Sequence, residues 1–285
     1  MRAGQHKHDS PNPTAVTRII DPSVLPAIEV EHLVTHYGSR NILKDIDLTV
    51  NQGEIMVIMG GSGSGKSTLL RHLLGLNRPT SGHIRLLGKD ITHINAREMH
   101  ELRKEMGVAF QGGALFSSMT VGENVQLPLC EHTKLDVHTM RIMTRMKLEV
   151  VNLSGFENLM PSELSGGMIK RAALARAIIM DPKLLFFDEP SAGLDPVVAA
   201  ELDELILRLR DAMKMTIVVV THELDSAFKI ADRITVLDQG VILMTGTVDE
   251  VRKSPNTRIQ NLLNRQPREE EVNADEYLHR LTRKQ

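Results

Sequence analysis

The chain has 285 residues, of which 41% are hydrophobic, so it can bury one large core or two moderate ones. Its 34 basic and 36 acidic residues give a formal net charge of −2, which excludes a global positive field for recruiting nucleic acid and leaves only a local patch open. Cys130 is the only cysteine, and no apolar run approaches the roughly 18 residues of a membrane span. We therefore expect a reduced, folded protein that reaches a membrane only through a partner, since no secretory leader pattern is present either.

Residues 1–26 differ in character from the rest of the chain. They carry four prolines among polar residues and show no sustained hydrophobic period, which indicates a mobile N-terminal extension. His6 and His8 alone would make a poor metal site, so a solvated tail is the favoured interpretation. Apolar residues then predict strands near 28–34 and 46–50. Tyr37, after the first of them, either stacks on an adenine ring or packs on the sheet.

A buried strand, a glycine-rich turn and a helix start follow one another at residues 55–71. Glycines let backbone N–H groups converge on a polyphosphate, and the start of the helix adds partial positive charge. We expect Lys66 to contact the phosphates of a nucleotide and Ser67 to place its hydroxyl on Mg²⁺. A flexible linker is disfavoured, because linkers lack this flanking strand and helix. The stretch after the apolar run 55–59 reads Gly60, Gly61, Ser62, Gly63, Ser64, Gly65, Lys66, Ser67 and Thr68.

The middle of the chain predicts a strand at 83–87, a short helix at 96–104 and a strand at 108–110. Gln111 follows that last strand, where α/β folds place ligand contacts. From about 121 to 160 apolar residues recur at helical spacing, which predicts a helical insertion. Most side chains of its methionine stripe, which includes Met140, Met143 and Met146, are interpreted as core residues rather than an exposed surface.

A second glycine-containing turn precedes a helix at residues 164–177. Ser165, Gly166 and Gly167 come directly before the strongly helical stretch 169–177. A hydroxyl and two glycines at a helix start predict a second anion site. The alternative is an ordinary helix cap with glycine, which would be credible if this turn stood alone.

Two carboxylates end the buried strand 184–187. Asp188 is expected in a Mg²⁺ shell, and Glu189 is expected to polarise the attacking water. A helix should run from Pro196 to about residue 213. The strand 217–220 is followed by His222, which is interpreted as a functional rather than a structural histidine because of its position. Residues 232–246 predict a closing hairpin.

Taken in this order, the motifs resemble those of ATP-binding cassette (ABC) ATPases over about residues 27–252. The resemblance implies an α/β phosphate-loop NTPase fold with an antiparallel β subdomain, a helical subdomain at about 112–180, and ATP and Mg²⁺ as ligands. Met168 replaces the glutamine of many members but leaves the rest of the signature intact, so an active ATPase is expected. The implied roles are adenine stacking for Tyr37, the Q-loop glutamine and a metal ligand for Gln111, the signature for Ser165, Gly166 and Gly167, the Walker B pair for Asp188 and Glu189, the D-loop aspartate for Asp195 and the switch histidine for His222.

Residues 110–121, 159–168 and 171–177 further resemble the ATPase subunits of Mla-type phospholipid transporters, which work with MCE-domain proteins. The resemblance implies a homodimer beneath an integral membrane permease, on the cytoplasmic face of the inner membrane. An MCE-domain lipid-binding subunit and a small accessory subunit are the other implied partners. The implied task is phospholipid trafficking between inner and outer membranes, which maintains outer-membrane lipid asymmetry.

Two other functions stay open for the chain. One is the ATPase of another ABC importer or exporter, for amino acids or lipoproteins. The other is a soluble ABC ATPase of DNA repair or translation. The second is disfavoured because the chain has one cassette, no coiled-coil insertion between Lys66 and Ser165, and no basic excess. A nucleic-acid partner is therefore not expected.

Two apolar segments predict contacts with partners. The loop 111–121 carries Leu115, Phe116 and Met119, which either form a groove for a permease helix or pack inside the helical subdomain. Residues 253–285 are expected to form a C-terminal extension with two helical segments. The first has its apolar face at Ile259, Leu262 and Leu263, and the second, at Tyr277, Leu278 and Leu281, is expected to dock on the partner protomer.

Overall fold

The antiparallel sheet is formed by the first part of the chain. A computed structural model describes residues 25–266, and its four-stranded sheet has the order β2-β1-β4-β5. Buried and exposed residues alternate along β2, as expected for a strand with one face on the core. Gly38, at φ +60°, lies in the turn that joins β1 to β2. The strands are β1 (Ile28–Tyr37), β2 (Arg40–Val50), β4 (Ser81–Leu86) and β5 (Lys89–Asp90).

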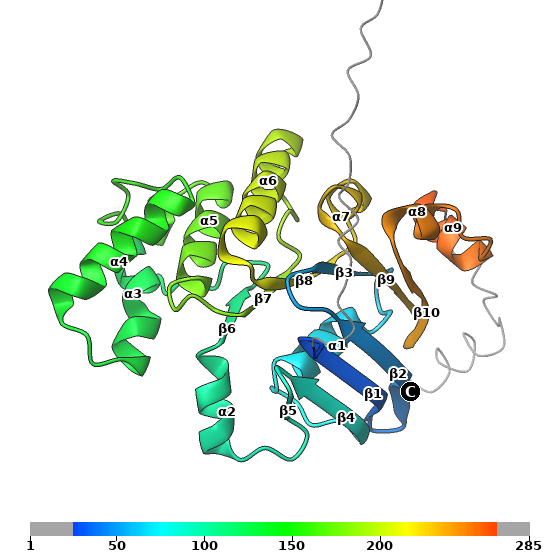
Figure 1. The fold of residues 1–285 in the computed structure, drawn as a ribbon. Helices are drawn as coiled ribbons and strands as arrows, with labels where there is room; N and C mark the ends of the chain where they lie inside the picture. Colours follow the sequence, from blue (N-terminus) through cyan, green and yellow to red (C-terminus); the bar gives the residue numbers. More distant parts are fainter. Residues whose placement is uncertain (1–24, 267–285) are drawn as a thin grey trace, which may run out of the picture.

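The second sheet is six-stranded and lies at the centre of the molecule, in the order β10-β9-β3-β8-β7-β6 (Figure 1). All neighbours in it are parallel except β9 and β10, which form the predicted hairpin. Every residue of β3 and β8 is buried, because helices or the other sheet cover both faces. The strands are β3 (Ile55–Met59), β6 (Met106–Ala109), β7 (Leu184–Asp188), β8 (Thr216–Thr221), β9 (Arg233–Asp238) and β10 (Val241–Gly246).

This central sheet separates two hydrophobic cores. On β3, Val57 and Met59 face one core, whereas Met56 and Ile58 face the other, as the alternation of a strand requires. The second core also takes residues from the antiparallel sheet and from α1 (Lys66–Leu73) and α2 (Ala96–Arg103). Because β3, β8, β7 and β6 run parallel, their carboxyl ends lie at the same edge of this sheet. The polar motifs that follow these strands therefore start on one side of the molecule.

The remaining helices pack on the first core. Helices α3 and α4 lie at one end of the molecule, and α8 and α9 lie at the other (Figure 1). Among residues 25–266 no helix is both long and apolar enough to cross a bilayer. The helices are α3 (Val121–His132), α4 (Val137–Val150), α5 (Gly166–Ala177), α6 (Pro196–Met213), α7 (Leu224–Ile230), α8 (Val248–Arg252) and α9 (Thr257–Leu263), with a 3₁₀ turn η1 (Pro161–Glu163).

The helical insertion predicted for 121–160 is shorter than expected. It consists of α3 and α4, and no α-helix follows over 151–160, where Asn152 and Gly155 have φ values of +58° and +84°. Met140 is buried and Met143 packs on the core, as predicted. Met146 is an exception to the predicted packing of most of these side chains, because it is 59% exposed. Helical spacing alone could not show that α4 keeps a second apolar face in solvent.

The C-terminal part of the described chain confirms one of its two predicted apolar segments. Ile259 on α9 is fully buried, and Leu262 and Leu263 pack against the same core. The second segment, with Tyr277, Leu278 and Leu281, lies outside the described residues, as do His6 and His8.

A buried histidine ties α1 to the antiparallel sheet and makes stability depend on pH. The Nδ1–H of His72 donates to the carbonyl of Asn77 (3.0 Å), so its Nε2 accepts from the hydroxyl of Thr35 (2.8 Å). Burial lowers the pKa of His72 from its usual 6.5, although the bond to Asn77 opposes this. Below about pH 6.5 the unfolded chain therefore takes up a proton that the folded chain resists, so the free energy of unfolding should fall.

We expect His72→Gln to flatten this loss of stability, because glutamine keeps a donor and an acceptor but does not titrate. Urea unfolding at about pH 7.5 and about pH 5.5 measures the change in each protein. His36→Gln, at an exposed position, is the matched control. An equal change in the wild type and in the His72 variant would contradict this role.

Candidate functional site

The glycine-rich turn between β3 and α1, which we call the phosphate loop (residues 60–67), depends on glycine for steric reasons. A Cβ on Gly60 would lie 2.1 Å from the carbonyl oxygen of Leu237. Gly65 has φ +109°, and a Cβ there would lie 2.8 Å from a methyl group of Leu43. Only a residue without a side chain fits these two positions, so the tight curl of the loop follows directly from the sequence.

The phosphate loop holds the ammonium of a buried lysine against its own backbone. The ammonium of Lys66 donates to the carbonyls of Gly60 (2.8 Å) and Gly61 (3.2 Å). Burial lowers its pKa, although the carboxylates of Glu189 and Asp188 oppose the shift. Lys66 is thus a desolvated cation next to two acids, at the start of a helix, which is an arrangement that favours an added polyanion.

Other residues of the phosphate loop add donors to this cradle. The Ser64 hydroxyl is buried and has no hydrogen-bond partner among residues 25–266. The backbone N–H of Gly240 donates to the carbonyl of Ser64 (2.9 Å), so the β9–β10 turn braces the loop. Ser67 is exposed and Thr68 is half-buried at the first turn of α1. The loop therefore holds one buried hydroxyl without a partner in this part of the chain, within the stretch for which the sequence predicted a phosphate site.

The acid pair lies at the carboxyl end of β7, on the strand two places from β3 in the sheet. Burial raises the pKa of Asp188, and the nearby charge of Glu189 raises it further, whereas Lys66 and Arg71 oppose the shift. Glu189 has φ +50°, a left-handed conformation that a side chain rarely adopts. Such backbone strain is concentrated at functional sites, where it fixes the direction of a side chain.

The carboxylate of Glu189 is held by the end of β8. Its Oε1 accepts from Nδ1–H of His222 (2.8 Å), and its Oε2 accepts from the hydroxyl of Thr221 (3.1 Å) and the backbone N–H of His222 (3.3 Å). The structure therefore brings the predicted pair Glu189 and His222 together. It adds Thr221, which sequence reasoning did not select, because a strand-end threonine carries no signal of its own.

A lysine on α5 clamps the backbone just beyond the acid pair. The ammonium of Lys170 donates to the carbonyls of Glu189 (3.3 Å), Pro190 (2.6 Å) and Ala192 (2.6 Å). Burial lowers its pKa, and the charge of Glu189 opposes this. Sequence reasoning missed this residue, since its partners lie about twenty positions away and are backbone atoms. Lys170 thus connects the helix after Ser165–Gly167 to the strained backbone at Glu189.

We expect Lys170→Met to lower the turnover of ATP by about tenfold while changing ATP affinity little. Removing the ammonium leaves three carbonyls without a donor and frees the backbone that aims Glu189. Methionine keeps most of the buried stem, so packing is largely retained. Phosphate release and nucleotide binding measure the two effects, and Lys229→Met, which removes a lysine from a carbonyl of α6, is the matched control. Equal loss of affinity and turnover would contradict a positioning role.

The second predicted anion site lies at the start of α5. Ser165 caps this helix by accepting from the N–H of Met168 (3.3 Å). This is the helix cap that the alternative interpretation of the sequence predicted. A Cβ on Gly167 would lie 2.7 Å from a methyl group of Val198 on α6. Among the described residues, no hydrogen bond joins Ser165, Gly166 or Gly167 to the phosphate loop.

The other predicted residues make no hydrogen bond to the acid pair or the loop among the contacts found within residues 25–266. Tyr37 is 46% exposed at the end of β1, and its hydroxyl accepts from the side chain of Asn77 (2.9 Å). Gln111 is exposed just beyond β6. Asp195 caps α6 by accepting from the N–H groups of Val197 and Val198 (both 3.1 Å). The structure places Asp195 at a helix start rather than in contact with the loop.

A strand–loop–helix cradle with a buried lysine, in the same sheet as a strand that ends in two acids, defines a phosphate-loop NTPase. A comparison with protein families matches residues 43–192, more than half of the chain, to the family described as ABC transporter. The chain belongs to this family and is an ABC-type ATPase. The expected fold class, with its antiparallel sheet and helical subdomain, is confirmed.

Curated relatives match most of the chain. An "intermembrane phospholipid transport system ATP-binding protein MlaF" from Haemophilus influenzae is 43% identical over 83% of this chain and 89% of its own length. The protein of the same name from Escherichia coli K12 is 41% identical over 86% of this chain and 91% of its own. A "probable ribonucleotide transport ATP-binding protein mkl" from Mycobacterium leprae is 41% identical over 84% of this chain and 69% of its own.

Solved structures agree with the family. The cbiO1 protein from Clostridium perfringens, described as part of an ABC transporter complex, has a TM-score of 0.75 and 31% identity over 80% of this chain and 91% of its own. The cassette MJ0796, solved as a dimer bound to ADP and phosphate, has a TM-score of 0.72 and 29% identity over 78% of this chain and 98% of its own. One of these two related structures thus holds a nucleotide.

Proposed function

We propose that the chain powers the movement of phospholipids between membranes, as the ATPase subunit of an Mla-type transporter. The observation that carries this proposal is the similarity to the two proteins named for intermembrane phospholipid transport, which extends over about nine tenths of their own lengths. The relative named for ribonucleotide transport is nearly as similar, but the chain spans only 69% of it. Phospholipid is therefore the favoured cargo, and a ribonucleotide is the competing one.

Nucleotide binding is assigned to residues of the described site. The ATPase domain is taken as residues 27–252, with its helical subdomain at about 112–180. Lys66 and the loop N–H groups would hold the phosphates, and Tyr37 would stack on the adenine. Ser67, Gln111 and Asp188 supply the oxygen donors that Mg²⁺ prefers, so the residues present fit this ion. When bound, Mg²⁺ neutralises phosphate charge.

Hydrolysis is assigned to the end of β7 and to a second copy of the chain. Glu189 would orient and deprotonate the attacking water, while His222 and Thr221 fix its carboxylate by the contacts described above. The exposed turn of Ser165, Gly166 and Gly167 would reach the nucleotide of the partner protomer, with Asp195 close to the same interface. ATP then favours a closed dimer through contacts that exist only in that state.

The remaining partners follow from the same proposal. The dimer would sit at the cytoplasmic face of the inner membrane, bound peripherally to an integral membrane permease, with an MCE-domain subunit and a small accessory subunit in the same complex. Ile142, Met146 and Val150 on α4 are exposed and spaced four residues apart, which gives an apolar helix face for a protein partner.

The loop after β6 offers a separate surface for the permease. Phe116 is 53% exposed, whereas Leu115 is half-buried and packs on the core. The buried amide of Asn124 organises this loop by bonds to both backbone groups of Phe116. Each of the two alternatives for this segment thus fits one of two neighbouring residues. Phe116 is available for docking, and Leu115 is used in packing.

We expect Phe116→Glu to weaken stimulation of ATPase activity by the permease several-fold without lowering the melting temperature of the isolated protein. A carboxylate replaces an apolar contact that desolvates on docking. Leu76→Glu, at a residue 55% exposed beyond α1, is the matched control. Full stimulation of the Phe116 variant would show that this surface is not the permease contact.

The cargo is tested with the complete complex. The chain would be purified with its membrane partner and placed in proteoliposomes that contain labelled phospholipids on one side and labelled ribonucleotides in the medium. We expect ATP-dependent redistribution of phospholipid, abolished by Lys66→Ala in the same complex. ATP-dependent uptake of ribonucleotide with no lipid movement would replace phospholipid by the competing cargo.

A further inference from the structure

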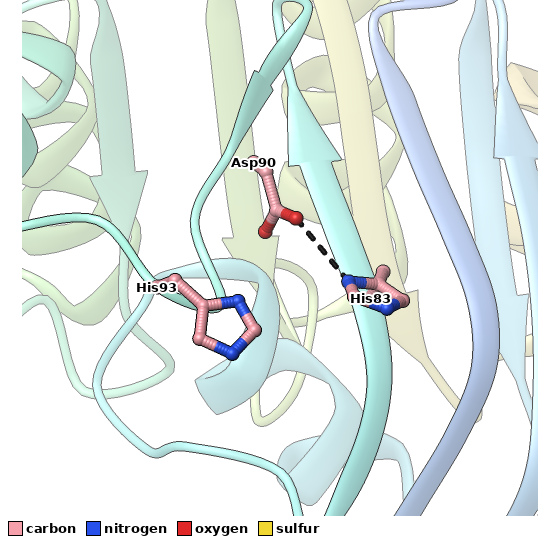
Figure 2. Close-up of side chains that lie close together, drawn as sticks. All are labelled: His83, Asp90 and His93. Carbon is pink, nitrogen blue, oxygen red and sulfur yellow. Dashed lines mark hydrogen bonds and ion pairs between the residues drawn. The ribbon is translucent and has the colours of Figure 1, made fainter.

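A cluster of metal-ligating side chains lies on the antiparallel subdomain, away from the phosphate loop. His83 comes from β4, Asp90 from β5, and His93 from the segment that leads to α2. One ligand atom of each residue lies within 4.8 Å of the others. Figure 2 shows the three side chains around a common space between β4 and that segment. None of the motifs of the ATPase site includes these residues.

The carboxylate of Asp90 is already oriented toward this space. Its Oδ1 accepts from the N–H of Thr92 (2.8 Å), and the Thr92 hydroxyl accepts from the N–H of Ile84 (3.0 Å). Its Oδ2 accepts from the Nδ1–H of His83 (3.2 Å). Asp90 is therefore held in place by a supporting hydrogen-bond network, as metal ligands commonly are.

The distances fit a small transition-metal ion. Ligands at about 2.0–2.1 Å from a tetrahedral zinc ion lie roughly 3.3–3.4 Å from one another. The separation of His83 Nδ1 and Asp90 Oδ2, 3.2 Å, is close to that value. The rings of His83 and His93 have centroids 6.0 Å apart, so each can turn one nitrogen to the same point. Two imidazoles and one carboxylate suit Zn²⁺ rather than Mg²⁺ or Ca²⁺, which prefer oxygen ligands alone.

We propose that His83, Asp90 and His93 form a Zn²⁺ site with water as its fourth ligand. The ion would replace the hydrogen bond between His83 and Asp90 and tie the β4–β5 hairpin to the segment before α2. It would bind the folded chain and not the unfolded one, so zinc should stabilise the protein. This inference is independent of the transported cargo.

A second group, His32 with Asp45 and Asp47, is a weaker candidate and serves as a comparison. It has one imidazole instead of two, and all three residues are exposed. His32 and Asp45 have φ values of +49° and +58°, so this group lies on irregular backbone. A site with a single nitrogen ligand has less selectivity for zinc.

The test is zinc binding by the full-length chain after dialysis against a chelator. Isothermal titration with zinc sulfate should show one tight equivalent per chain. His83→Ala and His93→Ala should each weaken it at least about tenfold, since loss of even a supporting residue commonly costs 10–100-fold. His6 and His8 of the N-terminal segment and the His32 group are the competing sources of binding. The double variant His6→Ala/His8→Ala and the variant His32→Ala should keep the tight equivalent.

Two further readouts guard against misfolding and weak surface binding. Cobalt(II) in place of zinc should give the intense visible absorption of four-coordinate cobalt, and the His93 variant should lose it. Zinc should raise the melting temperature of the wild type but not of His83→Ala, whose metal-free melting temperature should be unchanged because the His83 side chain is 51% exposed. Zinc binding that survives in both histidine variants, or that disappears in the His6/His8 variant, overturns the proposal.

Discussion

Glu189→Gln is expected to lower ATP turnover by about 10²–10⁴-fold while ATP still binds, because an amide cannot take the proton of the attacking water. The contacts of the Glu189 side chain should confine the effect of this substitution to proton transfer. Glutamine has nearly the same shape, so its side-chain oxygen can still accept from Thr221, and the left-handed backbone at Glu189 is unchanged. Phosphate release measures turnover, and equilibrium binding of a fluorescent ATP analogue measures affinity. A nucleotide-bound dimer should accumulate on size-exclusion chromatography, since hydrolysis no longer opens it.

The neighbouring carboxylate provides a matched control for this result. Glu223 lies 3.6 Å from Nε2 of His222, on the other side of the ring from Glu189. Glu223→Gln removes the same charge a short distance from the site, and it should leave turnover within a few-fold of the wild type. Near wild-type turnover in Glu189→Gln, or an equal loss in both variants, would remove Glu189 from the role of base.

The parts of the fold that follow from local sequence could be predicted. Buried strands such as β3 and β8 are continuous apolar runs, and the phosphate loop has glycines whose positions admit no Cβ. The hairpin of β9 and β10 follows from two apolar runs that flank Gly240. Polar residues that follow the buried strands were expected to lie near one another, and Glu189 and His222 do form a hydrogen bond.

The parts that depend on contacts between distant backbone atoms could not be predicted. Lys170 binds three carbonyls, and carbonyls are present at every position of a sequence. Met146 has the spacing of a core residue, yet α4 presents it to solvent, because periodicity shows that a face is apolar but not what covers it. The group of His83, Asp90 and His93 was likewise not selected, since its spacing matches no metal motif.

Ser165→Arg and Lys66→Ala test the shared site in a single mixing experiment, and each protein alone should have lost most of its ATPase activity. Arginine at residue 165 adds bulk and charge to the exposed turn before α5 and removes the cap on Met168. Its own phosphate loop is untouched, so ATP binding to the monomer should be nearly normal. Alanine at residue 66 removes the buried cation of the loop, which we propose to face the phosphates, so this variant should bind ATP much more weakly.

A mixed dimer of these two variants should regain one working site. The phosphate loop of the Ser165 variant then faces the intact turn of the Lys66 variant, and both lesions fall on the other site. Random assembly of equal amounts makes about half of the dimers mixed, so activity should return to roughly a quarter of the wild type if the two sites work independently. Differently tagged subunits show by co-purification that mixed dimers form, and melting temperatures show that each variant is folded. Mixed dimers with no recovered activity would mean that both sites must be intact together, whereas recovery without mixed dimers would place Ser165 outside the shared site.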